Sequence, residues 1–180
     1  MIRCMKEFVS AFRAARCVST PLVAVRTADP ASTTNLLADT VKQGRQPPPL
    51  LGWDIIRGLF GIGKDIAEEL ARVLGDRQPD TVGPADALSL AQLLADDGLL
   101  FYSNAHRFWN EPGVMQGIWN LRDSFKSTGR MLVLLTVPGA TLPRISEQSW
   151  WSPFSALTPV SAGRLPDDCA PCTTQLTTHL

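Results

Sequence analysis

The segment from Gly58 to Asp65 contains residue types that bind phosphate. It reads Gly-Leu-Phe-Gly-Ile-Gly-Lys-Asp and matches the pattern G-x-x-x-x-G-K-S/T at every position except the last. In a working phosphate loop, Gly58 and Gly63 would let backbone amides approach the phosphates, and Lys64 would contact them. The last position normally gives a hydroxyl to Mg²⁺, whereas Asp65 places a negative charge there. We favour a Gly-rich turn before a helix, and ATP with Mg²⁺ is expected only under the alternative, a phosphate-loop hydrolase.

Polar residues follow two short apolar runs, Leu99–Tyr102 and Met131–Leu135, that are typical of strands buried on both faces. These residues are Ser103, Asn104 and His106 after the first run, and Thr136 after the second. In open α/β sheets ligands bind beyond the carboxyl ends of the strands. A nucleotide hydrolase needs an acidic pair there. This chain offers hydroxyls, an amide and one imidazole, so we assign no catalytic residue, and His106 is interpreted as a loop histidine with structural hydrogen bonds.

The first predicted strand, Leu22–Val25, is followed by Arg26-Thr27-Ala28-Asp29-Pro30. A mononucleotide-binding fold has its phosphate loop after this strand. The segment contains neither glycine nor lysine, so its backbone cannot wrap closely around a triphosphate. The sequence therefore predicts that this position holds no nucleotide.

Three metal-ligating residue types occur near the end of the chain: Cys169, Cys172 and His179. A structural zinc site requires four ligands, and no second cysteine pair is present. We therefore predict no metal site.

Strands alternate with helices of 3.6-residue periodicity from the N-terminus to about Ile145. This alternation predicts an α/β domain with three layers, a mostly parallel sheet covered by helices on both faces. We expect a degenerate P-loop or RecA-like topology over residues 1–146 and an irregular tail over 147–180. The tail is interpreted either as a disordered segment or as the sign of a chain that was cut short or altered in reading frame.

The composition excludes several classes of partner. The 180 residues carry 17 basic and 17 acidic side chains, so no net charge attracts nucleic acid. No apolar stretch reaches the roughly 20 residues that cross a bilayer, and no signal peptide is evident. We expect a cytoplasmic protein that binds neither nucleic acid nor membrane.

Several segments together resemble the N-terminal domain of AAA-family ATPases similar to the chloroplast hypothetical-frame ATPase and its bacterial relatives. The resemblance extends from about Phe8 to Arg144. It rests on Phe8–Arg16, Thr20–Thr27, Trp53–Leu59, Leu99–His106 and, most specifically, Ser127–Pro143.

This resemblance implies a degenerate P-loop-like domain that precedes a separate hydrolysing module. It implies a non-catalytic regulatory or assembly role, with AAA motor subunits or further copies of the chain as partners. The tail departs from the pattern of the family, which favours a truncated form without the ATPase module.

Overall fold

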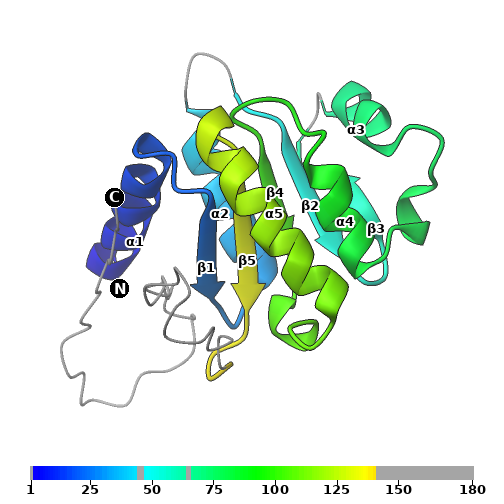
Figure 1. Ribbon diagram of the computed structural model, residues 1–180. Helices are drawn as coiled ribbons and strands as arrows, with labels where there is room; N and C mark the ends of the chain where they lie inside the picture. The colour runs from blue at the N-terminus through cyan, green and yellow to red at the C-terminus, as the bar shows by residue number, and fades with distance from the viewer. Residues whose placement is uncertain (1, 44–46, 64–65, 141–180) are drawn as a thin grey trace.

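The computed structural model describes residues 2–43, 47–63 and 66–140 (Figure 1). The elements in chain order are α1 (Ile2–Cys17), β1 (Leu22–Arg26), α2 (Pro30–Lys42), β2 (Leu50–Asp54), β3 (Gly58–Gly61), α3 (Ala67–Leu74), η1 (Pro79–Thr81), α4 (Pro84–Ala91), β4 (Leu99–Tyr102), η2 (Ala105–Arg107), α5 (Pro112–Thr128) and β5 (Met131–Thr136). The predicted tail, 147–180, lies outside the described residues, as do Cys169, Cys172 and His179.

The strands form one five-stranded sheet in the order β1-β5-β4-β2-β3 (Figure 1). β1, β5, β4 and β2 are parallel, and only β3 is antiparallel to its neighbour. The side chains of β4 and β5 are buried along their whole length, as expected for strands covered on both faces. The predicted mostly parallel α/β sheet is therefore confirmed.

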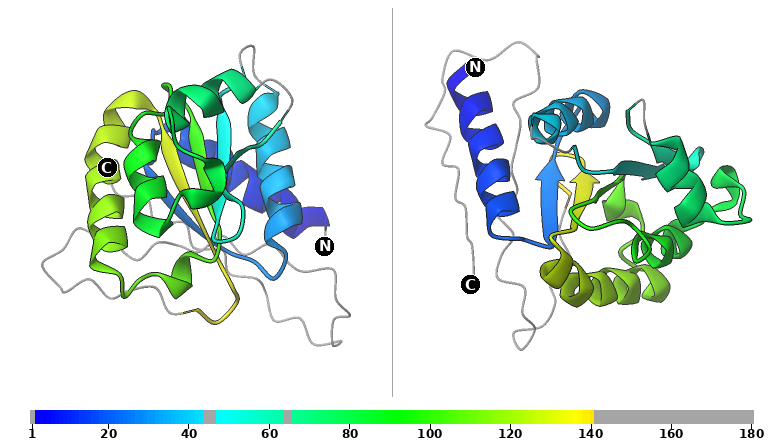
Figure 2. Two further views of the ribbon diagram at one scale, coloured as in Figure 1. Left: turned by 90° about the vertical axis from the view of Figure 1, so that its right-hand side faces the viewer. Right: turned by 90° about the horizontal axis from the view of Figure 1, so that it is seen from above.

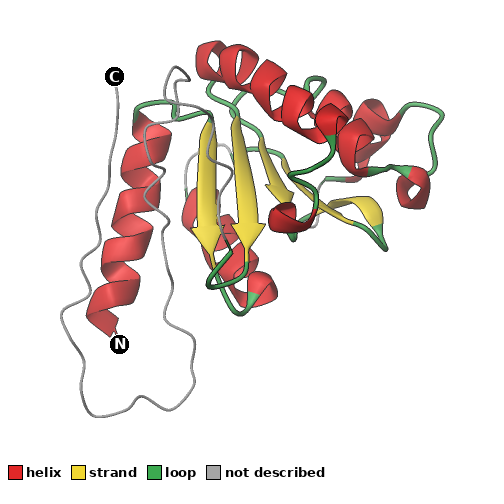
Figure 3. Ribbon diagram, turned by 60° about the horizontal axis from the view of Figure 1, so that its bottom comes forward, coloured by secondary structure: helices red, strands yellow, loops and turns green. Residues whose placement is uncertain are grey.

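Helices cover both faces of the sheet and give the three layers that the sequence predicts. Alternate residues of the strands point to opposite faces, so each face has its own apolar core. One core joins the sheet to α1 and α2, and the other joins it to α3, α4 and α5. Figure 2 shows α2 and α5 on opposite faces, with α1 beside β1, and Figure 3 shows the same layering in a third view.

The ends of two helices follow the local signals in the sequence. Asp29 caps α2 by accepting a hydrogen bond from the amide of Ser32 at 3.0 Å, and Pro30 occupies the first turn. Gly129 ends α5 in the left-handed conformation, with φ at 68°. These caps fix the directions in which the chain leaves β1 and enters β5.

The segment from Gly58 to Gly61 corrects the sequence-based interpretation. It is neither a turn before a helix nor a loop, but the antiparallel edge strand β3, joined to β2 by a hairpin. The Asp54 side chain forms this hairpin by accepting the amides of Ile56 and Arg57 at 2.9 and 2.8 Å. Gly58 completes the turn with φ at 64°, a value that glycine adopts without strain.

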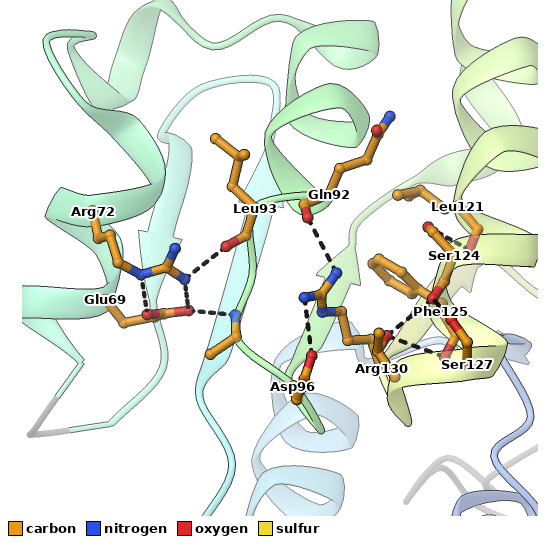
Figure 4. Close-up of polar contacts among 12 residues, drawn as sticks. Glu69, Arg72, Gln92, Leu93, Asp96, Leu121, Ser124, Phe125, Ser127 and Arg130 are labelled. Atoms are coloured by element: carbon orange, nitrogen blue, oxygen red, sulfur yellow. Dashed lines mark hydrogen bonds and ion pairs between the residues drawn. The ribbon is translucent and has the colours of Figure 1, made fainter.

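Charged side chains hold the loop between α4 and β4 at the amino-terminal edge of the sheet (Figure 4). Arg72 donates to both carboxylate oxygens of Glu69 at 2.9 and 2.7 Å and to the carbonyl of Leu93. Glu69 in turn accepts the amide of Ala95 at 2.7 Å. Arg130 contacts the same loop from the opposite side (Figure 4). The loop is therefore fixed by side chains from two other elements.

Glu69 gives this loop a pH dependence. The hydrogen bond from Arg72 lowers the pKa of Glu69 below its ordinary value of 4.5. A lowered pKa stabilises the folded state above pH 4.5, and this stabilisation disappears as the pH falls through the pKa of the folded protein. We expect Glu69→Gln to reduce the free energy of unfolding by about 1 kcal/mol at pH 7.

Urea unfolding of both proteins at several pH values measures this effect, and the difference should shrink steadily below pH 4.5. Asp86→Asn is the matched control, because Asp86 and Arg77 form an exposed pair at 3.4 Å. We expect this control to change the stability by less than about 0.5 kcal/mol. A constant difference between Glu69→Gln and the unmodified protein from pH 7 to pH 3 would contradict the assignment.

Candidate functional site at the carboxyl edge of the sheet

The carboxyl ends of β1, β5, β4 and β2 meet at one edge of the sheet, where open α/β sheets bind ligands. This edge includes Ser103, Asn104 and His106, which follow β4, and Thr136, which is the last residue of β5, as the sequence predicts. Arg26 lies beside Thr136, because these two residues are paired in the register of β1 and β5. This edge is the candidate functional site.

A buried group of hydroxyls occupies the position after β1 where a phosphate loop would lie. The hydroxyls of Thr27 and Thr33 are 2.7 Å apart, and both residues are buried. The Thr27 hydroxyl also accepts the amide of Asp29 at 3.0 Å. The Asp29 carboxylate caps α2, so the helix terminus that would attract an anion already carries a negative charge. Hydrogen bonds from Ser32 lower the pKa of Asp29 and hold it in the charged form.

The residues after β4 form a tight turn against the sheet. The amide of Ser103 donates to the carbonyl of Trp53 at 3.0 Å and extends the pairing of β4 with β2. Asn104 adopts the left-handed conformation, with φ at 53°, and starts η2. η2 lies against β5. Thr136 is buried, and its hydroxyl donates to the carbonyl of Val25 at 3.4 Å. The Ser103 amide and the Thr136 hydroxyl therefore bond to the backbone around them.

His106 differs from its sequence-based interpretation. Its Nδ1 atom is buried and has no hydrogen-bond partner within the described part of the chain, whereas structural hydrogen bonds were expected. Burial, together with the nearby Arg107, lowers the pKa of His106, so its ring is neutral at pH 7. Arg26 Nε and Trp109 Nε1 are also buried, and they too have no partner in residues 2–43, 47–63 and 66–140. No local pattern in the sequence predicts these unpaired groups.

The phosphate-loop-like segment does not join this edge. Gly58 pairs with Asp54 at the carboxyl end of β2, but β3 then runs antiparallel to β2 and toward the opposite edge. The amide of Ile62 donates to the carbonyl of Leu50 at the amino end of β2, so Gly63 lies beyond that end. Lys64 and Asp65 are outside the described residues. The structure therefore separates Gly63 from Ser103, Asn104, His106 and Thr136.

Two further observations concern metals and membranes. Over residues 2–43, 47–63 and 66–140, His, Cys, Asp and Glu side chains do not gather into a group of three that would suit a metal ion. No helix in these ranges combines the length and apolar character needed to cross a bilayer.

Comparison with known proteins identifies the family. No curated protein and no solved structure gives a significant match to this chain. The family model described as "SpoVK-like AAA ATPase, N-terminal domain" matches residues 4–147, which include every described helix and strand from β1 to β5. The chain therefore belongs to the family of SpoVK-like AAA ATPase N-terminal domains.

Proposed function

We propose that this domain is a non-catalytic regulatory or assembly module that works beside an AAA motor. The observation that carries this proposal is the chemistry of the carboxyl edge of the sheet. Asp29 occupies the terminus of α2 after β1, and Ser103 and Asn104 follow β4 in place of an acidic pair. A triphosphate with Mg²⁺ requires a backbone cradle and carboxylate ligands together. The described residues after β1 provide no glycine cradle, and the carboxylates at this edge, Asp29 and Asp54, already accept backbone amides of α2 and of the β2–β3 hairpin.

The position of the Gly-rich segment supports the same proposal. A phosphate loop must leave the carboxyl end of a parallel strand and wrap its amides around the phosphates. Here the backbone of Gly58–Gly61 is paired with β2 in an antiparallel ladder. The amides that would have to turn toward a ligand therefore lie in a strand.

Family membership supports the regulatory or assembly part of the proposal. The matching family is named for a domain that belongs to AAA ATPases, so its natural setting is beside a motor. AAA subunits commonly oligomerise, and we infer that this chain associates with motor subunits or with further copies of itself. Cys17 is exposed and is free among the described residues, which fits a reducing compartment and supports placing this role in the cytoplasm. The nearer relationship to the chloroplast hypothetical-frame ATPase and the domain division at 146/147 stay predictions.

Nucleotide binding and hydrolysis test the proposal directly. We expect the purified chain to release no phosphate from Mg-ATP above the blank, and calorimetric titration with Mg-ATP to give no binding heat. Lys64→Ala should behave like the unmodified chain in both assays. Hydrolysis that Lys64→Ala abolishes would overturn the proposal and establish the phosphate-loop alternative.

A motor module from the same family tests the regulatory role. Adding the chain to such a module is expected to change its ATPase rate or its sedimentation coefficient. An unfolded control, prepared by heating the chain, should have no such effect. If the folded chain changes neither property, the regulatory and assembly role is wrong even where nucleotide binding is absent.

A further inference from the structure

Arg26 is a cation that has no ion-pair partner in the part of the chain that the structure describes. It lies at the carboxyl end of β1. Its Nε atom is buried and has no hydrogen-bond partner among the described residues. A buried donor without an acceptor costs about 1–3 kcal/mol, and more when the group is charged. An arginine in this state indicates that an acceptor from outside the described residues completes its surroundings.

The geometry of the sheet places Arg26 close to two other unpaired groups. Leu22 and Ala24 belong to the core on the α5 face, so the alternation of β1 directs Arg26 to that face. Its register partner Thr136 continues the same face of β5, and η2 lies against β5. η2 contains His106, and Trp109 follows it and packs on the same core.

The spacing of the strands indicates how far Arg26 lies from the residues that follow β4. β1 and β4 are separated only by β5, which is about 10 Å at the usual strand spacing. Three of the four buried side-chain atoms without partners in the described residues, Arg26 Nε, His106 Nδ1 and Trp109 Nε1, therefore belong to residues at the carboxyl edge on the α5 face of the sheet.

The chemistry of these groups selects the ligand. Arginine Nε and tryptophan Nε1 only donate hydrogen bonds, so the ligand must accept them. His106 is neutral at pH 7 and its neighbour Arg107 is exposed, which leaves Arg26 as the cation with a buried unpaired donor among the described residues of this region. A phosphate dianion normally requires several cations or a nest of backbone amides. A carboxylate has one charge and two acceptor oxygens, and it matches one guanidinium fork.

The acidic side chains of this edge do not fill that role. Asp29 caps α2, and Asp54 is bonded to Arg57 and to the hairpin amides. Glu111 is exposed at the start of α5. None of the ion pairs among the described residues joins it to Arg26. We propose that the group formed by Arg26, His106 and Trp109 binds a carboxylate that comes from outside the described residues, either an acidic side chain of a protein or a small carboxylic acid.

The indole N–H of Trp109 reports on binding. In a ¹H–¹⁵N spectrum of the full chain, each tryptophan gives a separate indole signal, and Trp109→Phe identifies the one that belongs to this site. We expect this signal to move downfield and to saturate on titration with a capped glutamate or with glutarate. The capped glutamate represents a protein side chain, and glutarate represents a small acid, so the tighter of the two indicates the source. Capped glutamine is the neutral control and should leave the signal in place.

Substitutions at Arg26 test the guanidinium fork. Arg26→Met should weaken binding at least about tenfold, because it removes the charge and the donors. Arg26→Lys keeps the charge without the fork and should weaken binding about threefold to fivefold. Arg77→Met is the matched control at a remote exposed arginine and should bind like the unmodified chain. If Arg26→Met does not fold, judged by its melting curve, Arg26→Lys carries the test.

Four results would overturn the assignment. They are an unchanged indole signal with both carboxylates, an equal response to capped glutamine, tighter binding of inorganic phosphate than of either carboxylate, and unchanged affinity in Arg26→Lys together with Arg26→Met. None of these results bears on ATP hydrolysis. Failure of the carboxylate site and failure of the proposed function are therefore distinguishable.

Discussion

Replacing Trp53 with alanine is expected to lower the free energy of unfolding by about 4 kcal/mol or more, which would leave the domain close to its unfolding threshold. Trp53 is fully buried in β2, and its ring stacks on Tyr102 with centroids 4.3 Å apart. Phe108 contacts the same indole edge-on at 5.4 Å. The indole Nε1 also donates to the carbonyl of Val82 at 2.8 Å. Alanine would remove the packing and leave this buried carbonyl without its partner.

Trp53→Phe separates the contribution of ring packing from that of the hydrogen bond to Val82. Phenylalanine keeps an aromatic ring against Tyr102 but cannot donate to Val82, so we expect a loss of about 1–3 kcal/mol. Urea unfolding followed by far-ultraviolet circular dichroism measures both variants independently of tryptophan fluorescence. Equal losses in the two variants would show that the hydrogen bond, and not the packing, dominates at this position.

Gly58→Ala is expected to destabilise the domain by about 2–5 kcal/mol, because it combines backbone strain with a collision. The residue has φ at 64°, and a Cβ atom there would lie 1.7 Å from the carbonyl oxygen of Pro79. That oxygen belongs to the backbone, so it cannot rotate away as a side chain would. The hairpin between β2 and β3 would have to separate from η1.

Gly75→Ala is the matched control for this substitution. Gly75 also has a positive φ, at 58°, but a Cβ atom there would meet nothing within 4 Å. Its ψ of −124° lies outside the left-handed helical region, and we therefore expect only backbone strain, about 1–3 kcal/mol. Chemical unfolding of the two variants compares them directly. A Gly58→Ala variant as stable as Gly75→Ala would mean that this glycine does not serve the structural role that we assign to it.

The contrast between β4 and β3 shows what sequence patterns predict. Leu99–Tyr102 is a continuous apolar run, and only a strand covered on both faces makes such a run stable in a short segment. Gly58–Gly61 has no such pattern, and its glycines match a phosphate loop equally well. Its identity as a strand depends on the Asp54 turn and on pairing with β2, contacts that no local pattern contains. The division at 146/147 and the tail stay predictions, because residues 141–180 lie outside the described part of the chain.

The candidate site was predicted in part. The polar residues after β4 and at the end of β5 were found from their place beyond apolar runs, and the structure brings them to one edge. The sequence analysis did not connect Arg26 with Trp109. Arg26 is the last residue of β1, and Trp109 lies shortly after η2. An arginine at a strand end is usually solvated, so its type alone carries no signal.

The sequence by itself determined the alternation of helices and strands, the ends of α2 and α5, and the lack of a glycine cradle after β1. These features follow from periodicity and from backbone preferences of single residues, which act over a few positions. Only the tertiary structure decided that Gly58–Gly61 leads away from the ligand edge and that Arg26, His106 and Trp109 have unpaired atoms. Strand order and the pairing of buried polar groups depend on residues far apart in the chain, and one-dimensional patterns do not encode such distances.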